Sequence, residues 1–160
     1  MVCILQFRQS MNQMVTAIEV YKSTRELRLL AGSRVVKTFK VAFGPAYLQG
    51  DKRRQGDNRT PEGRYTITGH NPGSHYHRSL RVSYPTPSEK RRAKSLGINP
   101  GGDIMVHGLG AKRAWAGENH VMVDWTQGCI AVTNEEIEEI YAMVPNGTPI
   151  TIFNIGVRPA

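Results

Sequence analysis

The chain has 160 residues, of which 39% are hydrophobic and 21% are charged, so it carries enough apolar material for one core and is not a disordered polypeptide. Its 21 Lys and Arg residues exceed its 13 Asp and Glu residues, which gives a formal net charge of +8 and a surface that attracts nucleic acid, anionic lipid or an acidic polymer. The 2 cysteines exclude a disulfide framework and a Cys-rich zinc cluster, and no stretch approaches the ~18 apolar residues of a membrane span.

Residues 1–14, MVCILQFRQSMNQM, contain a short apolar patch and one Arg. They show no clear apolar h-region and no small-residue cleavage site, so they do not read as a clear signal peptide. We expect these residues, which include Cys3, to form an N-terminal lead that frays or is disordered. The rest of the chain contains no internal repeat and no low-complexity linker, so residues 15–160 are predicted to form a single domain.

Alternation of apolar and polar residues predicts a domain rich in strands. In the first half of the chain, the predicted strands cover residues 16–21, 26–30, 34–43, 64–68 and 79–84. A polar, Gly-punctuated loop is expected over residues 47–58, and a turn follows at 60–63. In the second half, short apolar runs predict strands over residues 103–107, 130–132 and 149–153.

Two capping boxes predict where helices begin. Thr86 and Glu89 open a short basic helix that runs to about residue 96, with Gly97 as its stop. Thr133 and Glu136 open a second helix, in which apolar side chains at 137, 140, 141 and 144 give one buried face. Because strands outnumber helices, we predict a mainly β fold, a sandwich or partly closed barrel with one or two flanking helices.

His107 and Cys129 are the strongest candidates for chemistry. His107 ends one predicted strand and Cys129 opens the next, so two strands joined by a long loop can bring them together. A thiol is a poor nucleophile until a neighbouring imidazole accepts its proton, and the resulting thiolate–imidazolium pair is attractive. The inert alternatives are a buried lone Cys and a His that serves only as a structural hydrogen bonder.

Glycines accompany both candidate residues. Gly128 would let a substrate carbonyl approach the backbone closely, and the amide N–H groups of Gly128 and Cys129 are expected to face a developing oxyanion. Gly108 follows His107 and leaves its carbonyl available to orient the imidazole. These residues predict a nucleophile, a base and an oxyanion site at one edge of the sheet.

Several motifs of the chain occur together in one known family. The motifs are HG at 107–108, TQGCIAV at 126–132, TNEE at 133–136, TPEGRY at 60–65 and NGTPITI at 146–152. They resemble motifs of the YkuD-type L,D-transpeptidases and follow one another along the chain as in that family, and the match covers most of residues 16–153. The commonest family motif is Ser-His-Gly-Cys-x-Arg. Here Thr126, Gln127 and Gly128 precede Cys129, and Ala131 replaces the Arg, which resembles a branch with Thr-x-Gly-Cys-Ile-Ala.

The resemblance implies an L,D-transpeptidase-like β domain that acts on peptidoglycan stem peptides with no cofactor and no metal. Cys129 would attack the carbonyl of the third stem residue, D-Ala would leave, and the resulting thioester would pass to an amine. His107 would act first as base and then as acid, with its ring held by the Gly108 carbonyl.

The resemblance also implies a substrate cleft and a cellular location. Thr126, Gln127 and Gly128 are expected to contact the substrate or the oxyanion. Tyr76 and His77 precede a core strand and are expected to line the cleft; an ordinary polar surface loop is the alternative. The periplasm or cell envelope is the expected location, and stem carboxylates would find partners among the basic residues.

Other functions stay open at this point. Water as the acceptor would make the protein an L,D-endopeptidase or hydrolase that trims stems or releases a wall-linked lipoprotein. A non-catalytic, basic wall-binding module is a more distant alternative, and no recognition motif supports nucleic acid as a partner. The 5 histidines could serve a metallohydrolase, although no zinc-binding spacing occurs. Gly-x-Ser-x-Gly, P-loop and dinucleotide motifs are absent from the sequence.

Overall fold

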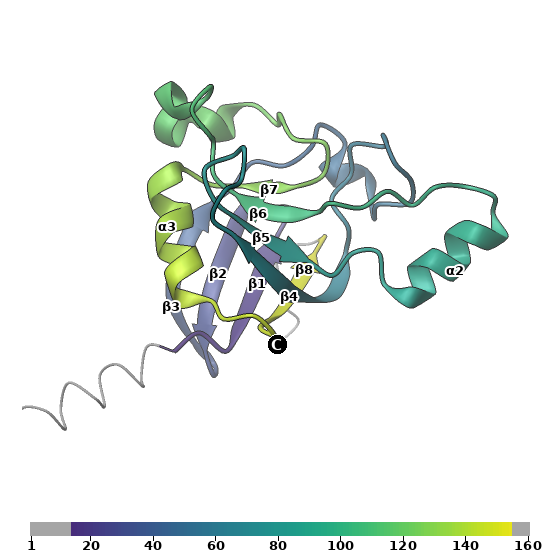
Figure 1. The fold of residues 1–160 in the computed structure, drawn as a ribbon, viewed down its shortest axis with the longest axis horizontal. Coiled ribbons are helices and arrows are strands. Elements are labelled where there is room, and N and C mark those ends of the chain that lie inside the picture. Colours follow the sequence, from purple (N-terminus) through teal and green to yellow (C-terminus); the bar gives the residue numbers. More distant parts are fainter. Residues whose placement is uncertain (1–13, 155–160) are drawn as a thin grey trace, which may run out of the picture.

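The computed structural model describes residues 14–154 (Figure 1). The predicted N-terminal lead over residues 1–14, with Cys3, lies outside the described residues except for Met14. Among the helices of the described part, none is long and apolar enough to cross a membrane.

Between residues 14 and 154, eight strands form one sheet whose spatial order differs from their order along the chain. The strands are β1 (Ala17–Tyr21), β2 (Glu26–Ala31), β3 (Arg34–Lys40), β4 (Gly63–Asn71), β5 (Ser79–Val82), β6 (Met105–His107), β7 (Ile130–Ala131) and β8 (Pro149–Phe153). Across the sheet they follow the order β3-β2-β1-β8-β4-β5-β6-β7. The C-terminal β8 therefore lies in the middle of the sheet, parallel to β1 and antiparallel to β4.

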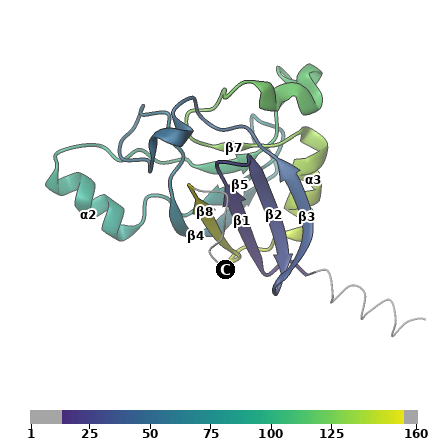
Figure 2. The ribbon, with the colours of Figure 1, turned by 180° about the vertical axis from the view of Figure 1, so that it is seen from behind.

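The two ends of the sheet approach each other. Ala42 follows edge strand β3 and pairs with Ala131 of the opposite edge strand β7 through two backbone hydrogen bonds, both 3.0 Å long. This pairing curls the sheet into a half-barrel, as the views from the two sides show (Figures 1 and 2). The prediction of a mainly β fold with a partly closed barrel is confirmed.

Alternating side chains of these strands fill the interior of the curled sheet. Val20 of β1, Leu27 of β2 and Ile67 of β4 are fully buried in the same core as Ile130 of β7. Burial of each such side chain stabilises the fold by about 1.5–3 kcal/mol. The period-two pattern of the sequence thus reflects one core that includes both the central strands and the short strand next to Cys129.

Two capped helices flank the sheet. Helix α3 (Asn134–Met143) buries Ile137 and Ile140 against the core, and Thr133 forms the predicted capping box with its third helical residue. Helix α2 (Pro87–Ser95) has the second capping box, but Ala93 is its only buried residue, and the helix extends away from the barrel (Figure 1). Both predicted helices are confirmed.

The structure differs from the predicted elements mainly between β6 and β7. Residues Ala114–Met122 form two short 3-10 turns, interrupted at Gly117 with φ of 49°. No apolar periodicity marks this segment, because its large apolar side chains Trp115 and Met122 are exposed. The predicted strand 34–43 ends at Lys40, since Ala42 has already left β2 and pairs with β7.

Candidate functional site

A cleft of about 770 Å³ opens where β6 ends and β7 begins, and both His107 and Cys129 line it. Strands β6 and β7 are parallel, with Val106 opposite Ile130 and His107 opposite Ala131. Cys129, which immediately precedes Ile130, is therefore a diagonal neighbour of His107 on the same face of the sheet. The long connection through residues 108–129 allows this parallel pairing, because parallel strands need a crossover.

The imidazole of His107 is buried and fixed by the backbone. Its Nδ1–H donates to the carbonyl oxygen of Gly108 at 2.6 Å, which leaves Nε2 as the acceptor nitrogen. A side chain at Gly108 has no room: a Cβ there would lie 2.8 Å from both Asn134 Oδ1 and the Tyr76 carbonyl oxygen. The glycine therefore brings its carbonyl close to the ring and packs tightly beneath helix α3.

Two aromatic side chains enclose the same imidazole. Tyr76 stacks on it with ring centroids 4.3 Å apart, and Trp125 meets it edge-on at 5.6 Å. Burial lowers the pKa of His107 to about 4, although the hydrogen bond to Gly108 favours the charged form; His120 lowers the pKa further. At neutral pH the imidazole is an uncharged base.

The thiol of Cys129 is half-buried and donates to the carbonyl oxygen of Asp103, 3.3 Å away. Asp103 has φ of 53°, a left-handed conformation that Asp tolerates better than most residues. Burial raises the pKa of Cys129 to about 11; the backbone N–H of Met105 opposes this rise, the Asp103 carboxylate adds to it, and Lys52 opposes it. The resting thiol is protonated.

The order of these two pKa values differs from the expected thiolate–imidazolium pair. With the pKa of His107 at about 4 and that of Cys129 at about 11, the proton rests on sulfur. The physical reason is burial, which penalises a charge on either group. The site is therefore arranged for the thiol to lose its proton only during attack on a carbonyl. The negative charge then develops on the substrate oxygen while the imidazole gains the proton.

The turn before Cys129 is held by Thr126. Its hydroxyl donates to the Cys129 carbonyl oxygen at 2.8 Å and accepts the Gly128 N–H at 3.2 Å. The Gly128 N–H is thus bonded inside the turn, and its role toward an oxyanion stays a prediction. Gly128 has φ of 134°, and a Cβ there would lie 2.6 Å from the Arg59 carbonyl oxygen. Gln127 is exposed and lines the cleft with Thr126.

Of the two residues predicted in the 75–78 loop, one lies in the cleft. Tyr76 lines it and stacks on the imidazole. His77, in contrast, is not part of the cleft lining: its Nε2 lies 2.7 Å from Glu138 Oε1 of helix α3. His77 has φ of 80°, and the substrate contact expected of it stays a prediction.

Further residues shape the cleft and were not among the predicted site residues. Trp125 and Arg113 line it, with the guanidinium carbon 4.5 Å from the indole centroid. Lys52 lines it as well and is 3% exposed; its ammonium donates to Asp57 Oδ1 at 2.8 Å. Of these contacts, only the ion pair of Lys52 and Asp57 could have been predicted from the sequence, because their charges are opposite. Lys52 stands in a run of three basic residues, which indicates a solvated surface instead.

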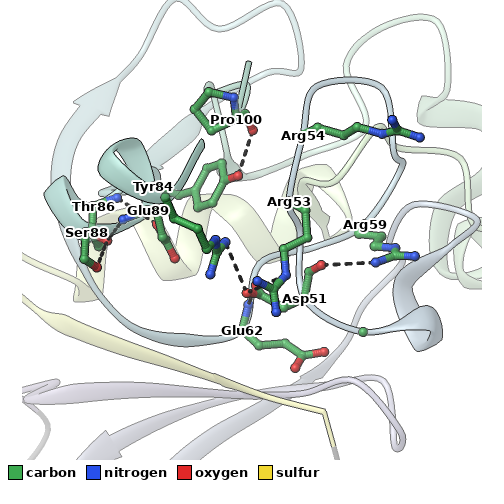
Figure 3. Close-up of polar contacts among 12 residues, drawn as sticks. Asp51, Arg53, Arg54, Arg59, Glu62, Tyr84, Thr86, Ser88, Glu89 and Pro100 are labelled. Carbon is green, nitrogen blue, oxygen red and sulfur yellow. Dashed lines mark hydrogen bonds and ion pairs between the residues drawn. The ribbon is translucent and has the colours of Figure 1, made fainter. Parts of the chain in front are cut away.

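The loop that carries Lys52 forms one wall of the cleft. Asp57 accepts from the Lys52 ammonium and from the backbone N–H groups of Arg53, Arg54 and Arg59. Burial acts to raise the pKa of Asp57, but these donors outweigh it and lower the pKa to about 2. In the same loop, the side chain of Asp51 lies in space beside Arg53 and also 3.8 Å from Arg92 of helix α2 (Figure 3). Carboxylates that belong to the loop itself therefore stabilise this wall of the cleft.

Residues 14–154 contain no ligand set that would support the metallohydrolase alternative. Within that range no three His, Cys, Asp or Glu side chains come together as a metal-binding group requires. The His70 ring, for example, lies against the Asn146 side chain and the Val144 carbonyl oxygen, and it does not line the cleft.

The chain matches a known domain family along most of its length. The model of the YkuD family, described as the L,D-transpeptidase catalytic domain, matches residues 15–152. YqjB of Bacillus subtilis (strain 168), a candidate L,D-transpeptidase, is 28% identical over 137 residues, which cover 83% of this chain and 68% of YqjB. YafK of Escherichia coli (strain K12), also a candidate L,D-transpeptidase, is 25% identical over 145 residues, which cover 87% of this chain and 51% of YafK.

Solved structures share the fold. The helical cell shape determining protein Pgp2 from Campylobacter jejuni superimposes with a TM-score of 0.69 at 24% identity, covering 89% of this chain and 49% of Pgp2. An L,D-transpeptidase from Mycobacterium smegmatis gives a TM-score of 0.56 at 15% identity, covering 86% of this chain and 58% of that one. The chain thus spans about half the length of YafK and Pgp2. On the family match over residues 15–152, the chain belongs to the YkuD family of L,D-transpeptidase catalytic domains, which act on peptidoglycan.

Proposed function

We propose that the chain is a cysteine-dependent acyltransferase that acts on peptidoglycan stem peptides through a thioester on Cys129. The observation that carries this proposal is that a thiol directly before β7 and a neutral imidazole at the end of the paired strand β6 line the same cleft. The Nδ1–H of His107 is held by Gly108, so the acceptor nitrogen Nε2 is the one left for proton transfer.

The reaction begins with attack of Cys129 sulfur on the carbonyl carbon of the third stem residue. The thiol proton passes to Nε2 of His107 as the carbon–sulfur bond forms and the carbonyl oxygen becomes an oxyanion. The bond to the fourth residue, D-Ala, then breaks, and the imidazolium returns its proton to the departing amine. The products of this half-reaction are free D-Ala, a neutral imidazole and a thioester on Cys129.

The second half-reaction repeats these steps with an acceptor. An incoming amine gives its proton to His107 as it attacks the thioester, and the thiol of Cys129 is released with that proton. An amine acceptor yields a cross-link or an anchored protein, whereas water yields a shortened stem. Because the free imidazole has a pKa of about 4, it can serve as the base throughout the neutral range.

The low pKa of the imidazole also fits this order of events. A strongly lowered pKa makes the imidazolium a strong acid, so the proton that it gains in the attack is readily given to the leaving amine. The thiol, with its raised pKa, stays protonated until substrate is bound, which limits side reactions of a free thiolate.

Hydrolysis, with water as acceptor, is the second candidate. The exposed position of Gln127 on the cleft leaves the route to the thioester open to solvent, which favours water when no amine is bound. Release of a wall-linked lipoprotein would be a special case of the same reaction. A role in cell-wall remodelling and cell shape, in the cell envelope, is supported by the family and by the likeness to Pgp2.

Digestion of purified peptidoglycan tests the proposal and separates its two forms. The protein and its Cys129→Ala variant are incubated with the polymer, and the products are analysed by mass spectrometry. New cross-linked dimers identify transfer to an amine, and shortened or released fragments identify hydrolysis. Identical product patterns with the wild-type protein and the Cys129→Ala variant would refute a role for the thiol.

A further inference from the structure

The cleft contains two permanently cationic side chains, Lys52 and Arg113, within the described part of the chain. The Lys52 ammonium is already satisfied, since it donates to Asp57 Oδ1 at 2.8 Å and to the Arg54 carbonyl oxygen at 3.1 Å. Its 3% exposure leaves it little access to a ligand. Lys52 therefore serves the wall of the cleft and is not available to an incoming anion.

Arg113 differs from Lys52 in both respects. Its side chain is exposed, and no carboxylate of residues 14–154 forms an ion pair with it. The carboxylate among the cleft-lining residues, that of Asp103, lies 2.9 Å from Arg81 Nη1 instead. The cleft thus holds one guanidinium whose charge is not balanced by an ion pair within the described residues.

The guanidinium of Arg113 is also oriented by its neighbour. It lies 4.5 Å from the centre of the Trp125 ring, and the same indole meets the imidazole of His107 edge-on at 5.6 Å. Stacking on an aromatic face fixes a planar guanidinium and leaves its N–H groups free at the edge of the plane. The oriented cation and the proposed base therefore contact the same indole ring.

We propose that Arg113 forms a subsite for a free carboxylate of the stem peptide, and this inference rests on the function proposed above. The fork of a guanidinium matches a carboxylate through two parallel hydrogen bonds. An extended residue spans about 3.5 Å, so the carboxylate of a terminal D-Ala lies only a short distance from the scissile carbonyl. Because Arg113 and His107 contact the same indole, Arg113 can hold this carboxylate while the scissile carbonyl lies at the thiol.

Two carboxylates near the scissile bond could occupy this subsite. One is the C-terminal carboxylate of D-Ala, and the other is the side-chain carboxylate of a third residue that is a diamino diacid. The shared chemistry is a carboxylate within about one residue of the bond that breaks. Recognition of the first would make the protein select stems with a free C-terminal D-Ala. Recognition of the second would make it select stems whose third residue carries a side-chain carboxylate.

Binding to an inactive variant tests the subsite without turnover. In the full chain carrying Cys129→Ala, or Cys129→Ser should the alanine variant be poorly folded, calorimetry measures the Kd of four stem tetrapeptides. One has all its carboxylates, one is amidated at the D-Ala terminus, one at the third-residue side chain, and one at every carboxylate. Each is measured with Arg113 intact, with Arg113→Gln, with Arg113→Lys, and with Lys112→Gln as a matched control, since Lys112 is an exposed neighbouring cation outside the cleft lining.

The expected result is a loss of affinity of about 10-fold or more for the unmodified peptide with Arg113→Gln, and little change with Lys112→Gln. The fully amidated peptide should bind equally well to the protein with Arg113 intact and to the Arg113→Gln variant, and the single amide that removes the Arg113 effect identifies the carboxylate. Arg113→Lys should retain part of the affinity, because the charge stays and the planar fork is lost. An equal loss with Arg113→Gln for the acid and the fully amidated peptides, or no loss at all, would overturn the subsite.

The outcome separates this inference from the proposed function. Release of D-Ala by the wild-type protein, together with its loss in Cys129→Ala, tests the reaction and does not involve Arg113. Turnover with no dependence of Kd on Arg113 would remove the subsite and keep the reaction. Carboxylate-dependent binding without any turnover would remove the reaction and keep the subsite.

Discussion

The thiol of Cys129 donates to the carbonyl oxygen of Asp103 at 3.3 Å, while the imidazole of His107 donates to the carbonyl oxygen of Gly108 at 2.6 Å. Each reactive side chain is thus held by a backbone carbonyl, and burial moves the pKa of each in the direction that favours its uncharged form. The hydrogen bond from the thiol to Asp103 must break before the proton can pass to His107. The resting site is a stable, neutral arrangement whose reactivity depends on an occupied cleft.

The pH dependence of kcat/KM for D-Ala release should show an acid limb near pH 4. The reason is that His107 must be neutral to accept the thiol proton, and its pKa lies at about 4. Activity should therefore be nearly constant from about pH 6 to 8, and stopped assays across about pH 3.5–9 measure it. An acid limb at about pH 6.5, the ordinary value for His, would contradict the described burial of this ring.

The burial of His107 should also make the fold sensitive to acid. The pKa falls from 6.5 when unfolded to about 4 when folded, so the unfolded chain binds the proton more tightly. The stability due to the neutral ring is therefore fully present above about pH 6.5 and is lost as the pH falls toward about 4, by about 3 kcal/mol. Urea denaturation at about pH 7 and about pH 4.5 measures the change, and His107→Gln should lose this part of it. Equal acid sensitivity in the two proteins would count against the assignment.

Tyr76 should maintain the low pKa of His107 by covering one face of the ring. The rings stack at 4.3 Å, so Tyr76→Ala admits water to the imidazole and should move its pKa upward toward the ordinary value of about 6.5. Tyr76→Phe keeps the stacked ring and is the matched control. NMR titration of the His107 ring protons distinguishes the variants, and an unchanged pKa in Tyr76→Ala would show that other groups provide the burial.

Gly128→Ala should destabilise the protein by roughly 3 kcal/mol, because it combines a strained backbone with a close contact. Gly128 has φ of 134°, and a Cβ would lie 2.6 Å from the Arg59 carbonyl oxygen. Gly56 has φ of 81° but open space around it, so Gly56→Ala should cost only about 1 kcal/mol. Chemical denaturation compares the two; equal losses would mean that contact with Arg59 contributes nothing.

The ion pair that holds the cleft wall should be essential to stability. Asp57→Asn leaves the ammonium of Lys52 3% exposed and without its carboxylate, which should cost about 3 kcal/mol. Removing the buried charge as well, in Lys52→Met with Asp57→Asn, should recover part of that loss, because the amide oxygen can still accept from the backbone N–H groups of the loop. Thermal unfolding of the three proteins measures these changes. A fully stable Asp57→Asn variant would mean that other interactions stabilise the wall of the cleft.

The strands and both helices could be predicted from the sequence because their signals are local. Alternation marks the strands, and the side chains of Thr86 and Thr133 cap the helices in the structure as their spacing predicts. The position of β8 between β1 and β4 could not be predicted in this way. Nothing in the local pattern of residues 149–153 indicates that the last strand pairs with the first, since this pairing depends on closure of the whole core.

The site was predictable to the extent that its residues sit at the ends of strands. His107 and Cys129 follow from strand ends and from residue chemistry, and their meeting follows from the parallel register of β6 and β7. Trp125 and Arg113 lie in a segment without periodicity, and their roles arise from contacts across the cleft. The contact between His77 and Glu138 of helix α3 could not be predicted either, because it joins residues far apart in the sequence.

Trapping of the acyl-enzyme shows whether Cys129 is the nucleophile. The full chain is incubated with a carbapenem, which carries a strained acyl bond open to thiolate attack, and its intact mass is measured before peptide mapping. We expect one added carbapenem mass on Cys129, no such mass on Cys3, loss of the adduct in Cys129→Ala and strong slowing in His107→Gln. A folded protein that gains no mass, or a Cys129→Ala variant that still carries the adduct, would contradict the account.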